Sequence, residues 1–182
     1  MRTFLCFLSF GFVAAASSLA QENKPVEHIS KLSIKRNGIP VTLEGTESIR
    51  TQATFKPPVE VTVVAKTDSN NLRLGYAADQ LIFNWERNPH ELRVDGGPAD
   101  GQHKIGAGLI PTNKYVTVRW VVLKDRQSIY VDNQLRYEHT GDYSRLDNPV
   151  IIFSNRSKVS VKSILIKDLA KTPNAGTTTT RS

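Results

Sequence analysis

An alternation of apolar and polar residues in the stretch from Val116 to Arg136 constrains the fold of this chain more than any other feature. From Val116 to Val122 every second residue is apolar, and Trp120 is one of them. Successive side chains of a strand point to opposite faces, so a period of two predicts a strand with one face in a core. Two further strand candidates follow, Ser128 to Val131 and Gln134 to Glu138, so we expect an antiparallel meander at the centre of the chain.

The same alternation recurs along the chain and predicts an all-β fold. About a dozen strand candidates are separated by turn signals, and no segment has the apolar period of a helix. Such a chain closes its core as two stacked antiparallel sheets or as a barrel. We predict an antiparallel two-sheet jelly-roll sandwich, with Phe83 and Trp85 pointing into the core. The first and last strands, Ser30 to Lys35 and Lys158 to Asp168, are expected to be neighbours.

The beginning of the chain has the features of a secretory signal peptide. Arg2 precedes an apolar run from Phe4 to Ala16, and the small residues Ser18 and Ala20 predict cleavage after Ala20. We therefore expect a secreted or periplasmic protein. The expected segments are a signal peptide (1–20), a disordered N-terminal segment (21–28), the sandwich (29–169) and a disordered threonine-rich tail (170–182). The single cysteine, Cys6, lies in the leader, so no disulfide is expected in the mature chain.

The formal net charge of +7 is spread over single basic residues between acids. This predicts a surface with a cationic bias, and the alternative is attraction to acidic polysaccharide, an anionic cell surface or nucleic acid. Nucleic acid is the least favoured of these for an exported protein. After the leader, no apolar stretch is long enough to cross a membrane.

The central strands carry a family resemblance. Lys114 to Trp120, then Ser128 to Leu135, and near the end Val159 to Lys167, resemble the late strands of laminin G-like and concanavalin A-like lectin/glucanase domains. The similarity in strand order and spacing extends from Glu47 to Asp168, with Asn133 where those domains usually have glycine. It implies the sandwich fold. It does not single out a function, because the architecture hosts lectins, adhesion modules, spacer domains and sugar hydrolases.

No catalytic motif accompanies this resemblance. The related glucanases carry a Glu-x-Asp-x-x-Glu strand, whereas no two acidic residues of this chain are separated by one position. Glu91 and Asp95 would lie about 13 Å apart along an extended strand, too far for either glycosidase geometry. A pair of Glu86 with Glu91 or Asp95 stays an alternative. The sequence leaves open whether the protein is an enzyme, and the absence of the glucanase motif favours a non-catalytic protein.

Metal and cofactor sites have weak support in the sequence. His90 and His103 with Asp95 or Asp100 would form a cluster only if the fold brought them together. The loops also offer Asp142 and Asp147 as oxygen ligands, which keeps calcium as an alternative. We expect no cofactor and assign no metal ligand.

A sugar site needs an aromatic surface and a few placed polar groups, and the segment from Asn84 to Arg93 is the densest mixture of both. The alternative is that Trp85 belongs to the core and that the polar residues form an ordinary exposed face. Apolar residues such as Val64, Ile82, Val121 and Leu123 on the polar faces indicate that part of such a face is covered or binds a partner. The candidate ligand-binding residues are Asn84, Trp85, Glu86, Arg87, His90, Arg93, Tyr137 and His139.

The function expected from these observations is an exported, non-catalytic module that binds carbohydrate, such as a cell-envelope polysaccharide. One alternative is a glycoside hydrolase or a 3-keto-disaccharide hydrolase, whose domains the sandwich also resembles. The other is a structural domain that binds a protein partner, for example by adding a strand at an open sheet edge.

Overall fold

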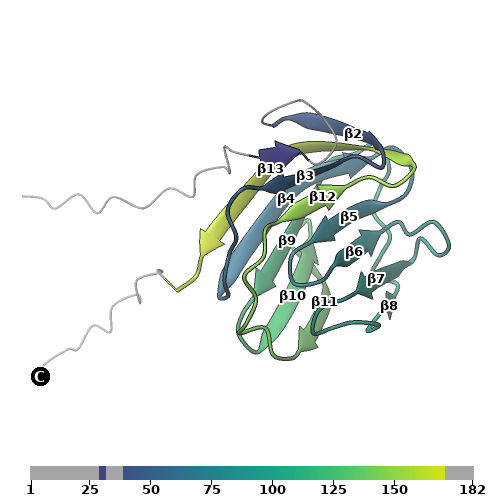
Figure 1. Ribbon diagram of the computed structural model, residues 1–182. Coiled ribbons are helices and arrows are strands. Elements are labelled where there is room, and N and C mark those ends of the chain that lie inside the picture. The colour runs from purple at the N-terminus through teal and green to yellow at the C-terminus, as the bar shows by residue number, and fades with distance from the viewer. Residues whose placement is uncertain (1–28, 32–38, 171–182) are drawn as a thin grey trace, which may run out of the picture.

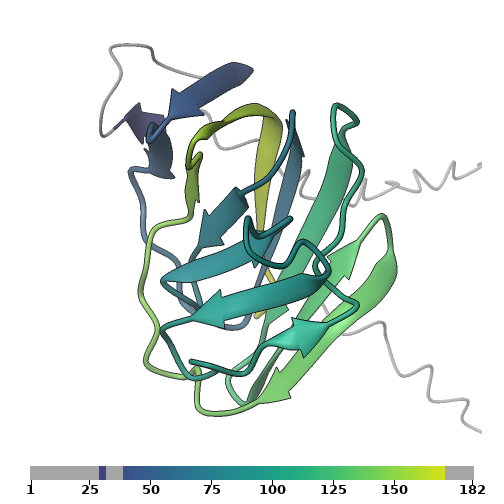
Figure 2. The same cartoon turned by 90° about the vertical axis from the view of Figure 1, so that its right-hand side faces the viewer.

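A computed structural model describes residues 29–31 and 39–170, which form two antiparallel β-sheets packed face to face (Figure 1). The order of the larger sheet is β1-β3-β12-β5-β6-β7-β8, and that of the smaller is β11-β10-β9-β4-β13-β2. Figure 2 shows the molecule from the side of β5 to β8. The predicted two-sheet jelly-roll sandwich is confirmed. The strands are β1 (Ile29–Lys31), β2 (Val41–Gly45), β3 (Ser48–Thr51), β4 (Val59–Thr67), β5 (Leu72–Gly75), β6 (Gln80–Phe83), β7 (Glu91–Asp95), β8 (Lys104–Ile105), β9 (Val116–Val122), β10 (Arg126–Val131), β11 (Gln134–Thr140), β12 (Ile151–Phe153) and β13 (Ser157–Asp168).

The core lies between the sheets and is built from rows of apolar residues in register. In the seven-stranded sheet one such row crosses β3, β12, β5, β6 and β7, and all of its side chains are fully buried. In the six-stranded sheet Val61, Trp120 and Ile129 pair across β4, β9 and β10. These rows are the buried half of the period-two pattern. The row of the larger sheet consists of Ile49, Ile152, Leu74, Leu81 and Val94.

Trp120 is the largest fully buried side chain of the core. Its ring packs edge-on against Tyr76, which follows β5 of the opposite sheet, with 6.1 Å between ring centroids. Its indole N–H donates a hydrogen bond of 2.8 Å to the Gln127 side-chain oxygen, which is also buried. The tryptophan therefore joins the two sheets and has a partner for its only polar atom.

Three sequence-based expectations about the strands were wrong or incomplete. The first and last strands lie in different sheets, because β1 pairs with β3 whereas β13 lies between β4 and β2. The expected strand from Lys104 to Leu109 ends at Ile105, because Gly106 has a φ of +83°. Gly108 approaches the backbone of Glu91 so closely that a Cβ atom would overlap it.

The third correction concerns Trp85, which does not continue the core face of β6. Asn84 has a φ of +49°, and this left-handed residue breaks the alternation after Phe83. Trp85 is consequently half-buried outside the core.

The expected signal peptide, the segment 21–28 and the tail after residue 170 lie outside the described residues. Within residues 29–31 and 39–170, the structure contains no helix that is long and apolar enough to span a membrane.

We predict that Trp120→Ala lowers the free energy of unfolding by about 3–5 kcal/mol, because it leaves a cavity between the sheets and an unpaired Gln127 oxygen. Urea denaturation followed by circular dichroism measures the change. Leu135→Ala is the control, since Leu135 is 54% exposed and its removal should alter stability by no more than about 0.5 kcal/mol. Equal effects of the two substitutions would contradict the assignment of Trp120 as the centre of the core.

Candidate functional site

The candidate site lies on the outer face of the seven-stranded sheet, where two arginines flank a buried isoleucine. Arg73 of β5, Ile82 of β6 and Arg93 of β7 occupy paired positions on neighbouring strands. Ile82 is only 2% exposed although it faces away from the core. Long arginine side chains cover apolar surface with their methylene groups, which accounts for this burial. The sequence predicted that part of the outer face around Ile82 is covered or binds a partner, and arginine side chains provide this cover.

Arg73 is held in place by three polar side chains. Its Nε and Nη2 atoms donate to the Asn71 side-chain oxygen at 3.1 and 2.9 Å, and Nη1 donates to the Gln80 oxygen at 2.7 Å. Nη2 also lies 3.2 Å from a carboxylate oxygen of Glu86. The Arg73 side chain is 13% exposed and that of Glu86 is 38% exposed. The arginine is therefore fixed, whereas the carboxylate beside it stays accessible to solvent.

Arg93 connects the polar face to an aromatic ring. Its Nε atom donates to a carboxylate oxygen of Asp95 at 2.9 Å. Its guanidinium carbon lies 4.4 Å from the centre of the Trp85 ring, so the cation is stacked on the indole. Trp85 therefore belongs to the outer face of the sheet. The sequence prediction that Trp85, Glu86 and Arg93 lie in one region is supported by these contacts, although Trp85 was also expected to point into the core.

Asn84 supports the loop that carries Trp85. Its side-chain N–H groups donate to the backbone carbonyls of Ser69 (3.2 Å) and Ile110 (2.9 Å), and its oxygen accepts from the Ile110 N–H (2.8 Å). Asn84 is 2% exposed, and the hydrogen bonds of its side chain all go to the backbone. Asn84 was predicted to bind ligand, and the structure gives it a supporting role.

A shallow pocket lies next to this loop at the end of the sandwich. Its volume is about 500 Å³. Asn84 and Pro89 form one side, and the chain leading to β9 forms the other. The lining is mostly apolar and includes a few hydroxyl and amide groups. It consists of Ser69, Asn70, Asn84, Pro89, Leu109, Ile110, Pro111 and Thr112.

The structure separates the other predicted residues into two groups. Arg87 and His90 are exposed in the loop between β6 and β7, which also carries Trp85. Tyr137 and His139 of β11 belong to the other sheet and line its inner side. They do not share a face with Glu86 and Arg93, which corrects the expectation that they would.

The inward position of Tyr137 results from the pairing of β10 with β11. The register shifts after Ile129, so Tyr137 lies opposite buried Ile129 and is itself 4% exposed. His139 Nδ1 lies 2.7 Å from the hydroxyl of buried Tyr143. Burial raises the pKa of both tyrosines, and for Tyr143 the neighbouring Tyr137 raises the pKa further. Tyr137 and Tyr143 belong to the core, and half-buried His139 packs against Tyr143.

Two of the residues suggested as metal ligands, His103 and Asp100, accept hydrogen bonds from the backbone. His103 Nδ1 accepts a hydrogen bond from the Val94 N–H at 3.0 Å, and Asp100 accepts one from the Gly96 N–H at 2.6 Å. Among residues 29–31 and 39–170, no three histidine, cysteine or acidic side chains are grouped as a metal site would require. The calcium alternative therefore gains no support from the described residues.

Sequence analysis missed Arg73 and Gln80 as parts of the site. A signal for Arg73 was present, because it stands between Leu72 and Leu74 in an alternating strand and therefore faces outward. The hydrogen bonds that join Arg73 to Gln80 and Glu86 depend on strand pairing and could not be read from spacing alone.

Three solved structures resemble this chain over most of its length. The β-glucanase of Bacillus licheniformis superposes with a TM-score of 0.56 at 12% sequence identity, covering 81% of this chain and 95% of that chain. The exoplasmic/lumenal domain of VIP36, in a form bound to Ca²⁺ and Man3GlcNAc, gives 0.54 at 12% identity, covering 76% of this chain and 81% of the other. The carbohydrate-binding module CBM66 of Bacillus subtilis gives 0.52 at 13% identity, covering 80% and 94%.

These likenesses define the fold class: the chain has the concanavalin A-like jelly-roll fold, which is shared by carbohydrate-binding modules, lectins and glycoside hydrolases. The fold implied by the sequence resemblance is confirmed, and its laminin G-like subdivision stays a prediction. No protein-family model and no curated protein sequence matches the chain.

We predict that Asn84→Ala destabilises the protein by about 2 kcal/mol or more, because it removes three hydrogen bonds of a buried amide and places alanine at positive φ. Asn133→Ala is the matched control, since Asn133 has a φ of +66° in the exposed turn between β10 and β11. The Asn133→Ala variant should show only the loss of stability that comes from alanine at a positive φ. Urea unfolding of both variants measures the difference, and equal losses would mean that the Asn84 side chain contributes nothing.

Proposed function

We propose that this protein is an exported, non-catalytic module that binds carbohydrate on the outer face of β5, β6 and β7. The observation that carries the proposal is the Trp85–Arg93 stack beside the fixed Arg73–Glu86 ion pair. An exposed part of an indole and a set of held polar groups are the two ingredients of a site for a polar, ring-shaped ligand. Tryptophan and arginine are also among the residues that most often dominate the binding energy of protein–protein interfaces.

The rigidity of this face supports a preformed site. Arg73 is immobilised by Asn71 and Gln80, and Arg93 by Asp95 and Trp85, so little side-chain entropy is lost when a ligand binds. Glu86 adds a hydrogen-bond acceptor next to these donors. The arrangement offers donors and acceptors for sugar hydroxyl groups beside an apolar ring.

The described contacts of the carboxylates favour binding over hydrolysis. Glycosidases generally place two carboxyl groups on either side of the scissile bond. Here Glu86 contacts Arg73 and Asp95 contacts Arg93, so each carboxylate is directed toward an arginine. The chain also lacks the acidic strand motif of the related glucanases. The experiments below also test the two alternatives, a hydrolase and a protein-interaction domain.

Export is part of the proposal and rests on the leader from Arg2 to Ala20. We expect a secreted or periplasmic protein whose mature chain begins at Gln21. Mass spectrometry of the protein recovered from the culture medium or the periplasm tests this. Recovery of the intact 182-residue chain from the cytoplasm would contradict it.

We predict that Trp85→Ala and Arg93→Ala each weaken binding to a polysaccharide about tenfold or more, because each removes one half of the stack. The purified protein is first screened against insoluble and soluble polysaccharides, with and without calcium, and the variants are then compared by isothermal titration calorimetry on the glycan that binds. Circular dichroism confirms that each variant is folded.

The chain contains a matched control on the opposite sheet. Arg119 is stacked on Tyr130 at 3.8 Å and forms an ion pair with Glu60 at 3.1 Å. Tyr130→Ala and Arg119→Ala should leave the affinity unchanged within about twofold. Binding that is indifferent to the Trp85 and Arg93 variants would move the site elsewhere. Binding to no glycan would overturn the proposal in favour of a protein partner, and release of reducing ends would favour the hydrolase.

A further inference from the structure

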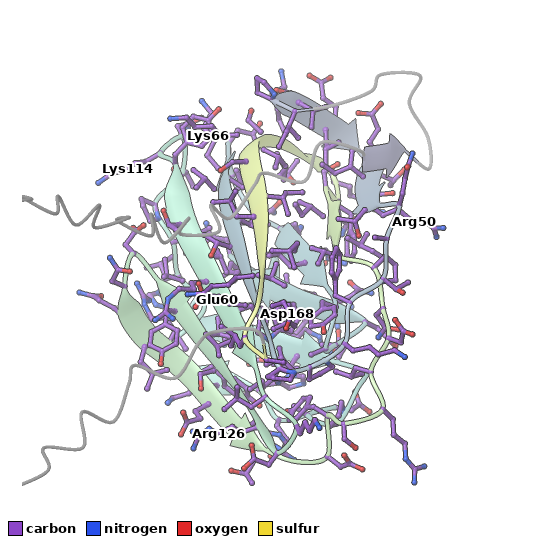
Figure 3. The ribbon with its side chains drawn as sticks, turned by 90° about the vertical axis from the view of Figure 1, so that its left-hand side faces the viewer. Arg50, Glu60, Lys66, Lys114, Arg126 and Asp168 are labelled. Atoms are coloured by element: carbon purple, nitrogen blue, oxygen red, sulfur yellow. The ribbon has the colours of Figure 1, made fainter. Side chains whose placement is uncertain are left out.

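A second surface of interest lies on the outer face of the six-stranded sheet, far from the sugar-binding face. Lys66 near the end of β4 and Lys162 of β13 approach Tyr115 there, and Lys114 precedes Tyr115 in the segment before β9. We call these four residues the lysine–tyrosine patch. Figure 3 shows Lys66 and Lys114 projecting from the same end of the sheet. Tyr115 is 41% exposed, and Lys114 and Lys162 are exposed as well.

A β-bulge places Lys162 in this patch. Val161 pairs with Ala65 and Ser163 pairs with Val64, so Lys162 is an extra residue of β13 without a place in the register. A bulge of this kind redirects a side chain and is a local feature that regular pairing would not produce. Val161 and Ile164 on either side remain fully buried. The extra residue is thus accommodated without disturbing the core, and a cation is presented on the outer face.

The two lysines converge on one aromatic ring. The ammonium nitrogen of Lys66 lies 5.1 Å from the centre of the Tyr115 ring, and that of Lys162 lies 5.9 Å from it. The ring attracts each cation, but two like charges beside one ring also repel each other. Among the ion pairs of the described residues, none includes Lys66, Lys114 or Lys162. An anionic ligand would offset the repulsion.

The carboxylates that border this end of the sheet already have backbone partners. Asp68 Oδ1 accepts a hydrogen bond from the Lys158 N–H at 3.0 Å, and Asp132 Oδ1 accepts one from the Thr117 N–H at 2.8 Å. Glu60 lies at the other end of β4 (Figure 3), and it pairs with Arg119. Six residues of strand, or about 20 Å, separate Glu60 from Lys66. Asp68 and Asp132 keep their negative charge in these hydrogen bonds, and the three lysines of the patch outnumber them at this end of the sheet.

Hydroxyl groups extend the patch across the sheet. Lys66 pairs with Ser160, which pairs with Thr42 on the edge strand β2. The two hydroxyl oxygens lie 3.1 Å apart and are half-buried on the outer face. An extended ligand that lies across β4, β13 and β2 would meet ammonium groups first and hydroxyl groups next.

We propose that the lysine–tyrosine patch binds an acidic polysaccharide, one that carries carboxylate groups on its sugar rings. The ammonium groups take the carboxylates, the Tyr115 ring packs against a sugar ring, and Ser160 and Thr42 exchange hydrogen bonds with sugar hydroxyls. The leader sequence favours this partner over nucleic acid, because an exported protein meets extracellular polysaccharide. The inference is independent of the Trp85 site, which lies on the other sheet.

The test uses polygalacturonate as the probe and isothermal titration calorimetry at low ionic strength. The double variant Lys66→Gln/Lys162→Gln should bind about tenfold more weakly than the unaltered protein, and its remaining affinity should depend less on salt because fewer charge contacts are made. The control Lys104→Gln/Lys124→Gln removes the same net charge from exposed lysines elsewhere and should lose no more than about twofold. Lys66→Arg/Lys162→Arg should retain binding.

Other outcomes would overturn the proposal. Equal losses in the two glutamine variants would show that polygalacturonate responds to net charge alone. Tighter binding of a single-stranded oligonucleotide than of polygalacturonate, with the same loss in the patch variant, would assign the patch to nucleic acid. No binding of polygalacturonate by the unaltered protein also refutes it. Loss of polygalacturonate binding in Trp85→Ala together with unchanged binding in Lys66→Gln/Lys162→Gln would place the ligand in the proposed sugar site and refute this inference.

Discussion

The burial of two one-sided sheets against each other is the interaction on which the rest of the structure depends. Each sheet has a mostly apolar inner face, and neither could remain in water alone without exposing it. Trp120 makes the contact between them most directly, because its ring meets Tyr76 of the opposite sheet and its N–H is satisfied by Gln127. With the inner faces committed to the core, the outer faces are left to carry function.

The outer faces of the two sheets share one arrangement of side chains but differ in the residues around it. On both sheets an arginine is stacked on an aromatic ring and is paired with a carboxylate. On the seven-stranded sheet, a second arginine, Arg73, is fixed beside the stack by Asn71, Gln80 and Glu86. That added network distinguishes a candidate binding site from a stack that only covers the apolar outer face.

Where strand pairing ends, a few polar side chains hold the loops in position through hydrogen bonds to the backbone. Asn84 is the clearest case, because its amide binds the backbone at Ser69 and Ile110, which come from segments before and after it in the chain. The sequence alone does not distinguish such a buried asparagine from an exposed asparagine that binds a ligand. Its left-handed backbone also ends the alternation of β6 and moves Trp85 out of the core. One residue thereby shapes both the pocket and the aromatic part of the site.

The sequence alone determined the fold class, since period-two alternation directly records which side chains face a core, and most strands were found where it predicted them. It also located Trp85, Glu86 and Arg93 in one segment. Only the tertiary structure decided that Arg73 joins them, that Tyr137 points inward and that Lys162 approaches Tyr115. Those outcomes follow from strand order and from register shifts at bulges, which are set by contacts between distant segments and leave no local periodic signal.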